Sequence, residues 1–151
     1  MKNKNILLLN GPNLNLLGTR EVKLYGSMSL KKLIKILKCK CKILKCNLFH
    51  LQSNSESKLI DCLHQSKEKI DYIIFNPAAF THTSIALRDA ILAINIPFIE
   101  VHISNIHSRE KFRSKSKFSD IANGTISGLG VEGYIIALKI ALKRLQKNRK
   151  N

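Results

Sequence analysis

The stretch Asn5-Ile-Leu-Leu-Leu-Asn10-Gly-Pro-Asn13 decides the fold. Its short apolar run ends in polar and turn-forming residues, which is typical of a strand buried in a parallel sheet. More runs of this kind follow, and amphipathic helical stretches separate them, a pattern that predicts an α/β domain. The predicted strands are 5–10, 47–53, 71–76, 97–102 and 125–127.

The stretch from Ser29 to Lys45 has the period of an amphipathic helix. Apolar residues recur at offsets of three and four, lysines lie on the other face, and Ser29 is the predicted N-cap. The predicted buried face is Leu30, Leu33, Ile34, Leu37, Cys41 and Leu44. Further helices are predicted at about 55–69, 84–94 and 131–146. This α/β alternation fits a flavodoxin-like doubly wound parallel sheet, order 2-1-3-4-5, with helices on both faces.

Length and composition indicate one globular domain. The 151 residues fit a single catalytic domain, 1–151, and 44% hydrophobic content is ordinary for such a domain. The basic end of the chain, residues 147–151, is expected to be frayed. No apolar run approaches the roughly 18 residues that a membrane span needs, and no signal peptide is recognisable. We therefore expect a cytoplasmic protein without a membrane partner.

The net charge of +16 raises the alternative of a nucleic-acid-binding protein. The excess is mostly lysine, spread along the predicted helices and the C-terminal tail. No zinc finger, RNP motif or KH-type loop is present. We therefore expect no nucleic-acid partner, although the positive potential helps to attract an anionic substrate.

The cysteines do not form a usual zinc or disulfide pattern. Cys39, Cys41 and Cys46 have C-x-C-x4-C spacing, and Cys62 is distant. Buried or half-buried free thiols are expected, with metal binding as the lesser alternative.

The sequence Gly128-Leu-Gly-Val-Glu-Gly133 matches the G-x-G-x-x-G pattern of dinucleotide-binding sites. Such a site also needs a following strand with an acidic residue, and the chain ends in a basic helix instead. The glycines are therefore interpreted as permitting a tight turn and close helix–sheet packing.

Ligands of open parallel sheets bind beyond the carboxyl ends of the strands. Three segments leave the predicted strands there and are rich in polar groups: 11–26, 76–83 and 102–113. We expect them to converge. The long, glycine-containing first segment is typical of a mobile lid, although a plain surface loop is the alternative reading.

The third segment, together with the end of the strand before it, offers the clearest chemistry. Glu100 and His102 point to the same face of a strand. A carboxylate beside an imidazole fixes its tautomer and favours its protonated form, which suits a general acid. Arg109 and Arg113 share a face if this segment is helical, and paired arginines recognise anions. These features suggest a hydroxylated carboxylate substrate, acid–base chemistry, and no cofactor or metal.

Several motifs together resemble the type II 3-dehydroquinate dehydratases, and they cover about residues 5 to 145 in consistent order and spacing. They are Asn10-Gly-Pro-Asn-Leu-Asn-Leu-Leu-Gly18, Arg20-Glu21, Tyr25-Gly26, Asn76-Pro-Ala-Ala-Phe-Thr-His-Thr-Ser84, Ala86-Leu-Arg-Asp89, Glu100-Val-His-Ile-Ser-Asn105, Gly124-Thr-Ile-Ser-Gly-Leu-Gly130 and Gly133-Tyr134.

The resemblance implies a lyase that dehydrates 3-dehydroquinate to 3-dehydroshikimate through an enolate, by anti elimination, as the third step of the shikimate pathway. Tyr25 would be the base, and Arg20 would hold its phenolate. Asn13 would stabilise the enolate through a water. His102, oriented by Glu100, would protonate the departing hydroxyl.

The resemblance also implies how the substrate is bound. Asn76 and the backbone of Ile103 and Ser104 would bind its carboxylate. His82 and Arg113 would bind its ring hydroxyls.

A homododecamer built from trimers is implied as well, with Asp89 reaching into a neighbouring subunit's site. The sequence departs from the family pattern at Val22, where proline is usual, and at Ala78 and Phe80, where glycine and tyrosine are more common. The first change is expected to loosen the lid, and the others bear on substrate affinity.

Overall fold

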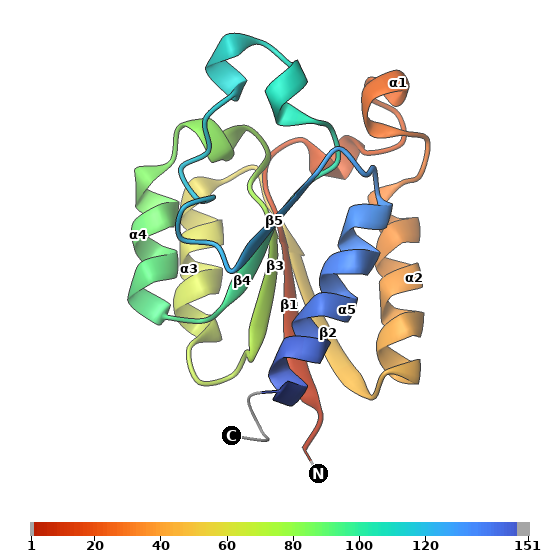
Figure 1. Ribbon diagram of the computed structural model, residues 1–151, viewed down its shortest axis with the longest axis vertical. Coiled ribbons are helices and arrows are strands. Elements are labelled where there is room, and N and C mark those ends of the chain that lie inside the picture. The colour runs from red at the N-terminus through yellow and green to blue at the C-terminus, as the bar shows by residue number, and fades with distance from the viewer. Residues whose placement is uncertain (1, 148–151) are drawn as a thin grey trace.

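The computed structural model describes residues 2–147. Their five strands form one parallel sheet in the order β2-β1-β3-β4-β5, as predicted (Figure 1). The strands are β1 (Lys4–Asn10), β2 (Cys46–Gln52), β3 (Tyr72–Asn76), β4 (Phe98–His102) and β5 (Gly124–Ser127). Each begins and ends within one residue of its predicted bounds.

Four long helices cover the sheet: α2 (Leu30–Ile43), α3 (Glu56–Ser66), α4 (Ile85–Ile94) and α5 (Glu132–Lys147). Serine hydroxyls cap the first three, because Ser29, Ser55 and Ser84 accept backbone N–H groups of the first turns. Helices α2 and α3 end earlier than predicted. The reason is that Lys45 and Glu68 adopt left-handed backbone (φ 53° and 65°), which turns the chain toward the next strand.

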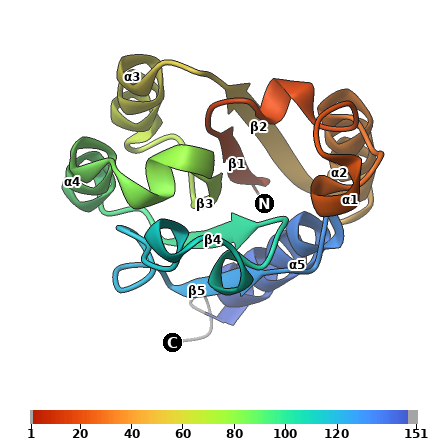
Figure 2. The same cartoon turned by 90° about the horizontal axis from the view of Figure 1, so that it is seen from above.

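The central strand β1 divides the core between the two faces of the sheet. Ile6 and Leu8 pack in the cluster that includes α2 and α5, whereas Leu7 and Leu9 pack in the cluster that includes α3 and α4. Figure 2 shows these helix pairs on opposite sides of the sheet. The prediction of the buried face is wrong at one residue. Leu44 is 43% exposed because it lies beyond the end of α2.

Short helical segments lie beyond the carboxyl ends of the strands, at the top of Figure 1. They are η1 (Leu14–Leu16), α1 (Val22–Tyr25), η2 (Ala78–His82), η3 (Ile106–Ser108) and η4 (Lys111–Arg113). The α-helical face considered for Arg109 and Arg113 is therefore not formed, since Arg109 falls between two 3-10 turns.

Gly11 marks a close contact between the ends of β1 and β3. Its N–H donates to the carbonyl of Asn76 at 2.8 Å, and a Cβ at this position would lie 2.2 Å from the carbonyl oxygen of Pro77. Only glycine fits there without displacing the backbone. The contact brings the first and second polar segments together.

The glycine pattern at 128–133 serves packing, as interpreted from the sequence. Gly128 and Gly130 have positive φ angles of 82° and 59°. A Cβ on Gly133 would lie 3.1 Å from the side chain of Ile126, so this glycine allows α5 to approach the sheet closely.

Several compositional expectations can be compared with the described residues. The four cysteines are free; Cys41 and Cys46 are buried and Cys62 is half-buried, but Cys39 is exposed, contrary to expectation. Lys147 still belongs to α5, so the predicted fraying does not begin there, and 148–151 lie outside the described residues. Within residues 2–147, no helix has the length and apolarity that crossing a membrane requires.

Ala78 has left-handed backbone, with φ 53°. This conformation costs an L-residue with a Cβ about 1–2 kcal/mol, which gives a physical reason for glycine to be more usual at this position. We predict that Ala78→Gly raises the free energy of unfolding by roughly 0.5–1 kcal/mol, because the strain relieved exceeds the added entropy of the unfolded chain. Urea denaturation measures the change.

The matched control for this prediction is Ala79→Gly, at the next position, whose φ is not positive. We expect it to lower stability, since glycine there adds unfolded-state entropy and relieves no strain. A loss of stability in Ala78→Gly as large as that in the control would contradict the explanation.

Candidate active site

The three polar segments converge on one cavity at the carboxyl edge of the sheet, as predicted. Its lining residues all come from these segments: Pro12, Asn13, Leu14, Leu17, Arg20, Tyr25, Asn76, Ala78, Ala79, His82, His102, Ile103, Ser104, Ile106, Arg109 and Arg113. The cavity volume is about 140 Å³. A cavity of about 150 Å³ accommodates a benzene ring, so the site suits one small cyclic molecule rather than a dinucleotide.

Tyr25 enters the cavity from the end of α1, on the first segment. Its phenolic oxygen accepts a hydrogen bond from Nη1 of Arg109 at 2.8 Å. The contact expected of Arg20 is thus made by Arg109. The guanidinium carbons of Arg20 and Arg109 each lie 5.6 Å from the centre of the Tyr25 ring, but Nη2 of Arg20 is turned to the carboxylate of Glu21, at 3.2 Å.

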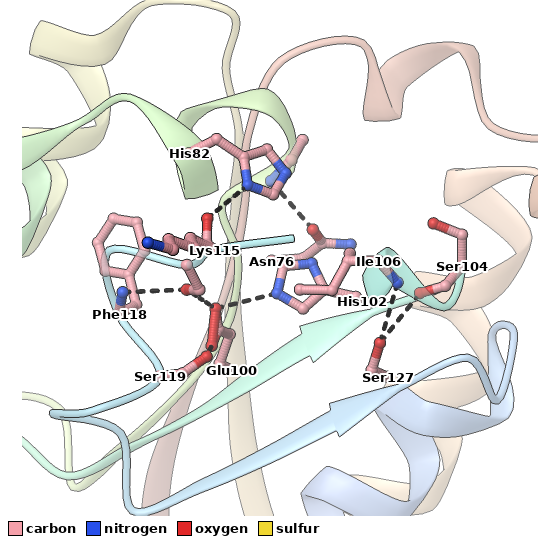
Figure 3. Close-up of polar contacts among 12 residues, drawn as sticks. Asn76, His82, Glu100, His102, Ser104, Ile106, Lys115, Phe118, Ser119 and Ser127 are labelled. Carbon is pink, nitrogen blue, oxygen red and sulfur yellow. Dashed lines mark hydrogen bonds and ion pairs between the residues drawn. The ribbon is translucent and has the colours of Figure 1, made fainter. Parts of the chain in front are cut away.

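Glu100 and His102 lie on the same face of β4, as the strand alternation predicts. Nε2 of His102 is 3.0 Å from Oε1 of Glu100, and Glu100 is fully buried (Figure 3). Ser116 donates to Oε1 as well, and Ser119 donates to Oε2 at 2.5 Å. Burial raises the pKa of Glu100, but the hydrogen bonds and the nearby His102 outweigh it, so the pKa lies below its ordinary value.

His82 lies above this pair and presents one ring nitrogen to a backbone carbonyl. Its Nδ1 is 2.8 Å from the carbonyl oxygen of Lys115, which can only accept, so Nδ1 carries the proton (Figure 3). Burial lowers the pKa of His82, and the charges of His102 and Arg113 lower it further. The neutral ring therefore keeps Nε2 as a hydrogen-bond acceptor.

Asn76 at the end of β3 is held in a fixed orientation. Its Oδ1 accepts the N–H of Ala78 at 3.0 Å, and its Nδ2 donates to the hydroxyl of Tyr134 at 2.8 Å. The Tyr134 hydroxyl donates in turn to Oδ1 of Asn10 at 2.7 Å. Burial raises the pKa of Tyr134, so the phenol stays neutral and acts as a bridge. The second N–H of Asn76 remains for the cavity.

Arg109 and Arg113 share one carboxylate. Oε2 of Glu110 lies 2.9 Å from Nε of Arg113 and 3.8 Å from Nε of Arg109. A hydrogen bond from its own backbone N–H lowers the pKa of the Glu110 carboxyl, and the charges of Arg113 and Arg109 lower it further. The two guanidiniums therefore lie close together although the segment between them is not an α-helix.

The remaining predicted residues fall into two groups. Asn13, Ile103 and Ser104 line the cavity. Asn13 has left-handed backbone (φ 66°), and its N–H donates to Oδ1 of Asn54 at 2.9 Å. Asp89 does not line the cavity; it is exposed on α4.

Sequence reasoning missed several contributors. Arg109 was recognised only as an anion-binding candidate, whereas Ser116, Ser119 and Tyr134 were given no role. These last three support lining residues from behind, and no periodic pattern marks such positions. Among residues 2–147, no group of three or more His, Cys, Asp or Glu side chains is arranged to hold a metal ion.

Comparisons with known proteins agree with this geometry. Residues 4–142 match the family model of dehydroquinase class II. A 3-dehydroquinate dehydratase of Erwinia tasmaniensis is 61% identical over 140 residues, which cover 93% of each chain. Another, from Buchnera aphidicola subsp. Acyrthosiphon pisum (strain Tuc7), is 60% identical over 146 residues, covering 96% of this chain and 97% of the relative.

Solved structures are also similar. The type II dehydroquinase of Butyrivibrio crossotus superposes with a TM-score of 0.90 at 40% identity, over 92% of this chain and 97% of that one. The type II dehydroquinase of Propionibacterium acnes gives the same TM-score and identity over 93% and 97% of the two chains. The family match, these identities and the shared architecture agree: the chain belongs to the class II dehydroquinase family.

Proposed function

We propose that the cavity dehydrates 3-dehydroquinate to 3-dehydroshikimate, with Tyr25 as the base and His102 as the acid. Membership of the family indicates the reaction, a step of the shikimate pathway. One observation carries the assignment of roles: a phenol oxygen bound by a guanidinium and an imidazole bound by a buried carboxylate line the same small cavity.

In the first step, the phenolate of Tyr25 removes a proton from the carbon beside the ketone, and an enolate forms. A free tyrosine ionises near pH 10, so lowering this by two to three units requires about 3–4 kcal/mol. An exposed ion pair supplies only about 0.2–1 kcal/mol. Arg109, with a side chain 13% exposed and a direct bond to the oxygen, is better placed than Arg20, which is 41% exposed.

In the second step, the enolate returns to the ketone and expels the hydroxyl on the β-carbon. His102 gives this hydroxyl a proton, so that it leaves as water and a carbon–carbon double bond forms. Tyr25 has gained one proton and His102 has lost one, and exchange with solvent restores both. Anti elimination requires the two side chains to act from opposite sides of the bound ring.

Substrate recognition follows from the neutral and charged groups around the cavity. Asn76 and the backbone N–H groups of Ile103 and Ser104 bind the carboxylate. His82 accepts from a ring hydroxyl through its free Nε2, and Arg113 donates to another. Asn13 stabilises the enolate oxygen through a water.

We also propose that the protein is cytoplasmic and forms a homododecamer built from trimers. In this assembly, Asp89 acts in the site of a neighbouring subunit. Its support is the surface of α4, where Asp89 lies between two exposed apolar residues: Ile85 is 59% exposed and Leu92 is 51% exposed. Offsets of four and three place the three side chains on one helical face. Packing of this face against another subunit would bury the apolar pair and bring the carboxylate with it.

The direct test of the function is turnover of 3-dehydroquinate by purified protein, followed by the ultraviolet absorbance of the conjugated product. We expect turnover that borohydride does not inactivate, because no lysine forms a Schiff base with substrate in this mechanism. Absence of any absorbance change with folded, oligomeric protein would refute the function. Inactivation by borohydride would refute the mechanism.

The second test separates the two arginines near the base. Tyr25→Phe should lower kcat by about 10²–10⁴-fold, the range of a general base. Arg109→Ala should lower kcat by roughly 10–100-fold, because a hydrogen bond to a charged group contributes about 1.5–3 kcal/mol. Lys23→Ala, a change of an exposed residue on helix α1 beside Tyr25, is the control. Near-normal turnover of Arg109→Ala, together with a large loss of turnover in Arg20→Ala, would show that Arg20 and not Arg109 stabilises the Tyr25 phenolate.

The third test concerns Asp89. We expect Asp89→Asn to lower kcat/KM by roughly tenfold while light scattering still reports the wild-type oligomer, since one hydrogen bond to the neighbouring site is weakened. Asp61→Asn, an exposed acid on α3, is the matched control and should change neither quantity. A fully active monomer would rule out a contribution across subunits.

A further inference from the structure

The segment from Lys115 to Ser119 lies between η4 and β5 and does not line the cavity. It contacts His82 directly and contacts Glu100, the carboxylate that pairs with His102. We propose that Ser116 and Ser119 are positioning residues that hold the Glu100 carboxylate as an anion against His102. The same segment fixes the tautomer of His82 through the carbonyl of Lys115. The inference rests on the proposed function and adds to it the residues that keep the acid protonated.

The direction of each hydrogen bond follows from the partners. Oε1 of Glu100 faces Nε2 of His102 and the hydroxyl of Ser116, and Oε2 faces the hydroxyl of Ser119. The Ser116 oxygen also accepts the N–H of Phe118 at 3.0 Å, so its single proton is directed at Glu100. An ionised carboxylate accepts from all three donors, whereas a neutral carboxyl would carry a proton into one of these contacts. The arrangement therefore selects the anion.

Burial makes these donors necessary. Glu100 is 0% exposed, and a buried charge without partners strongly destabilises the fold. The pKa of Glu100 is raised by burial and brought below its ordinary value by hydrogen bonds from His102, Ser116 and Ser119. Loss of the two hydroxyls leaves the burial and removes the compensation. The proton between Nε2 of His102 and Glu100 then moves toward Glu100, and His102 becomes a neutral imidazole, which is a much weaker acid toward the leaving hydroxyl.

The segment is itself anchored at both sides. The N–H of Lys117 donates to the carbonyl of Thr81 at 2.8 Å, and its own carbonyl accepts from Nη1 of Arg88 at 2.8 Å. Phe118 is fully buried, with its ring edge-on to Phe75 at 5.3 Å. The serines beside it are therefore held at a fixed distance from β4.

The test uses Ser116→Ala and Ser119→Ala, singly and together, in the full chain. We expect kcat to fall roughly tenfold for each single variant, with little change in KM, since each loses one hydrogen bond to a charged group. Because His102 then keeps its proton less well, the alkaline limb of the kcat profile should move to lower pH. The acid limb should stay in place, because neither serine contacts Tyr25.

Two sets of variants control for general damage to the fold. Ser114→Ala removes a hydroxyl that donates to the carbonyl of Lys111 in the same stretch, and it should keep the wild-type profile. Ser116→Thr and Ser119→Thr retain the hydroxyl and should restore the alkaline limb. An unshifted limb in both alanine variants would overturn the inference, as would a shifted limb in Ser114→Ala.

A second measurement does not depend on turnover or on the double variant. Titration of the His102 ring by ¹⁵N NMR in ligand-free protein should show proton loss at lower pH in each single alanine variant than in wild type. An unchanged titration would overturn the inference. If wild-type protein does not turn over 3-dehydroquinate, the proposed function fails, and the NMR titration still decides whether the serines control His102.

Discussion

The buried carboxylate of Glu100 is the constraint around which the site is organised. It lies on a strand whose five residues are all buried, and a charge there is stable only if donors surround it. His102 supplies one donor from the same strand, and the chain returns from η4 to supply two more. Residues 114–123 therefore do two things: they connect η4 to β5, and they supply donors that stabilise the buried charge of Glu100.

The same crossing explains why the two histidines differ. The segment that donates to Glu100 also presents a carbonyl to His82, so His102 contacts a carboxylate and His82 contacts a neutral backbone acceptor. Burial and the charges of His102 and Arg113 lower the pKa of His82, so this histidine stays neutral. Backbone geometry thus gives two chemically identical side chains different environments, as their different proposed roles require.

The sheet, its order and the long helices could be predicted because their signals are local. Apolar runs and three-to-four-residue periods depend on near neighbours, and the Ser29 cap lies at the start of its own helix. The convergence of the polar segments followed from a rule about strand ends. The departures concern partners distant in sequence: Tyr134 contacts Asn76 and Asn10 across 58 and 124 positions, and Arg109 contacts Tyr25 across 84.

Those distant contacts also show why the choice between arginines required coordinates. The resemblance to the family names Arg20, five positions from Tyr25, as the residue that would hold its phenolate. Both arginines line the cavity, but Arg20 is 41% exposed and pairs with Glu21, whereas Arg109 is 13% exposed and donates to the phenol oxygen. Since a charge acts more strongly where water is excluded, we expect the more buried guanidinium to have the greater effect on the Tyr25 hydroxyl. Proximity along the chain and electrostatic influence are therefore separate properties in this site.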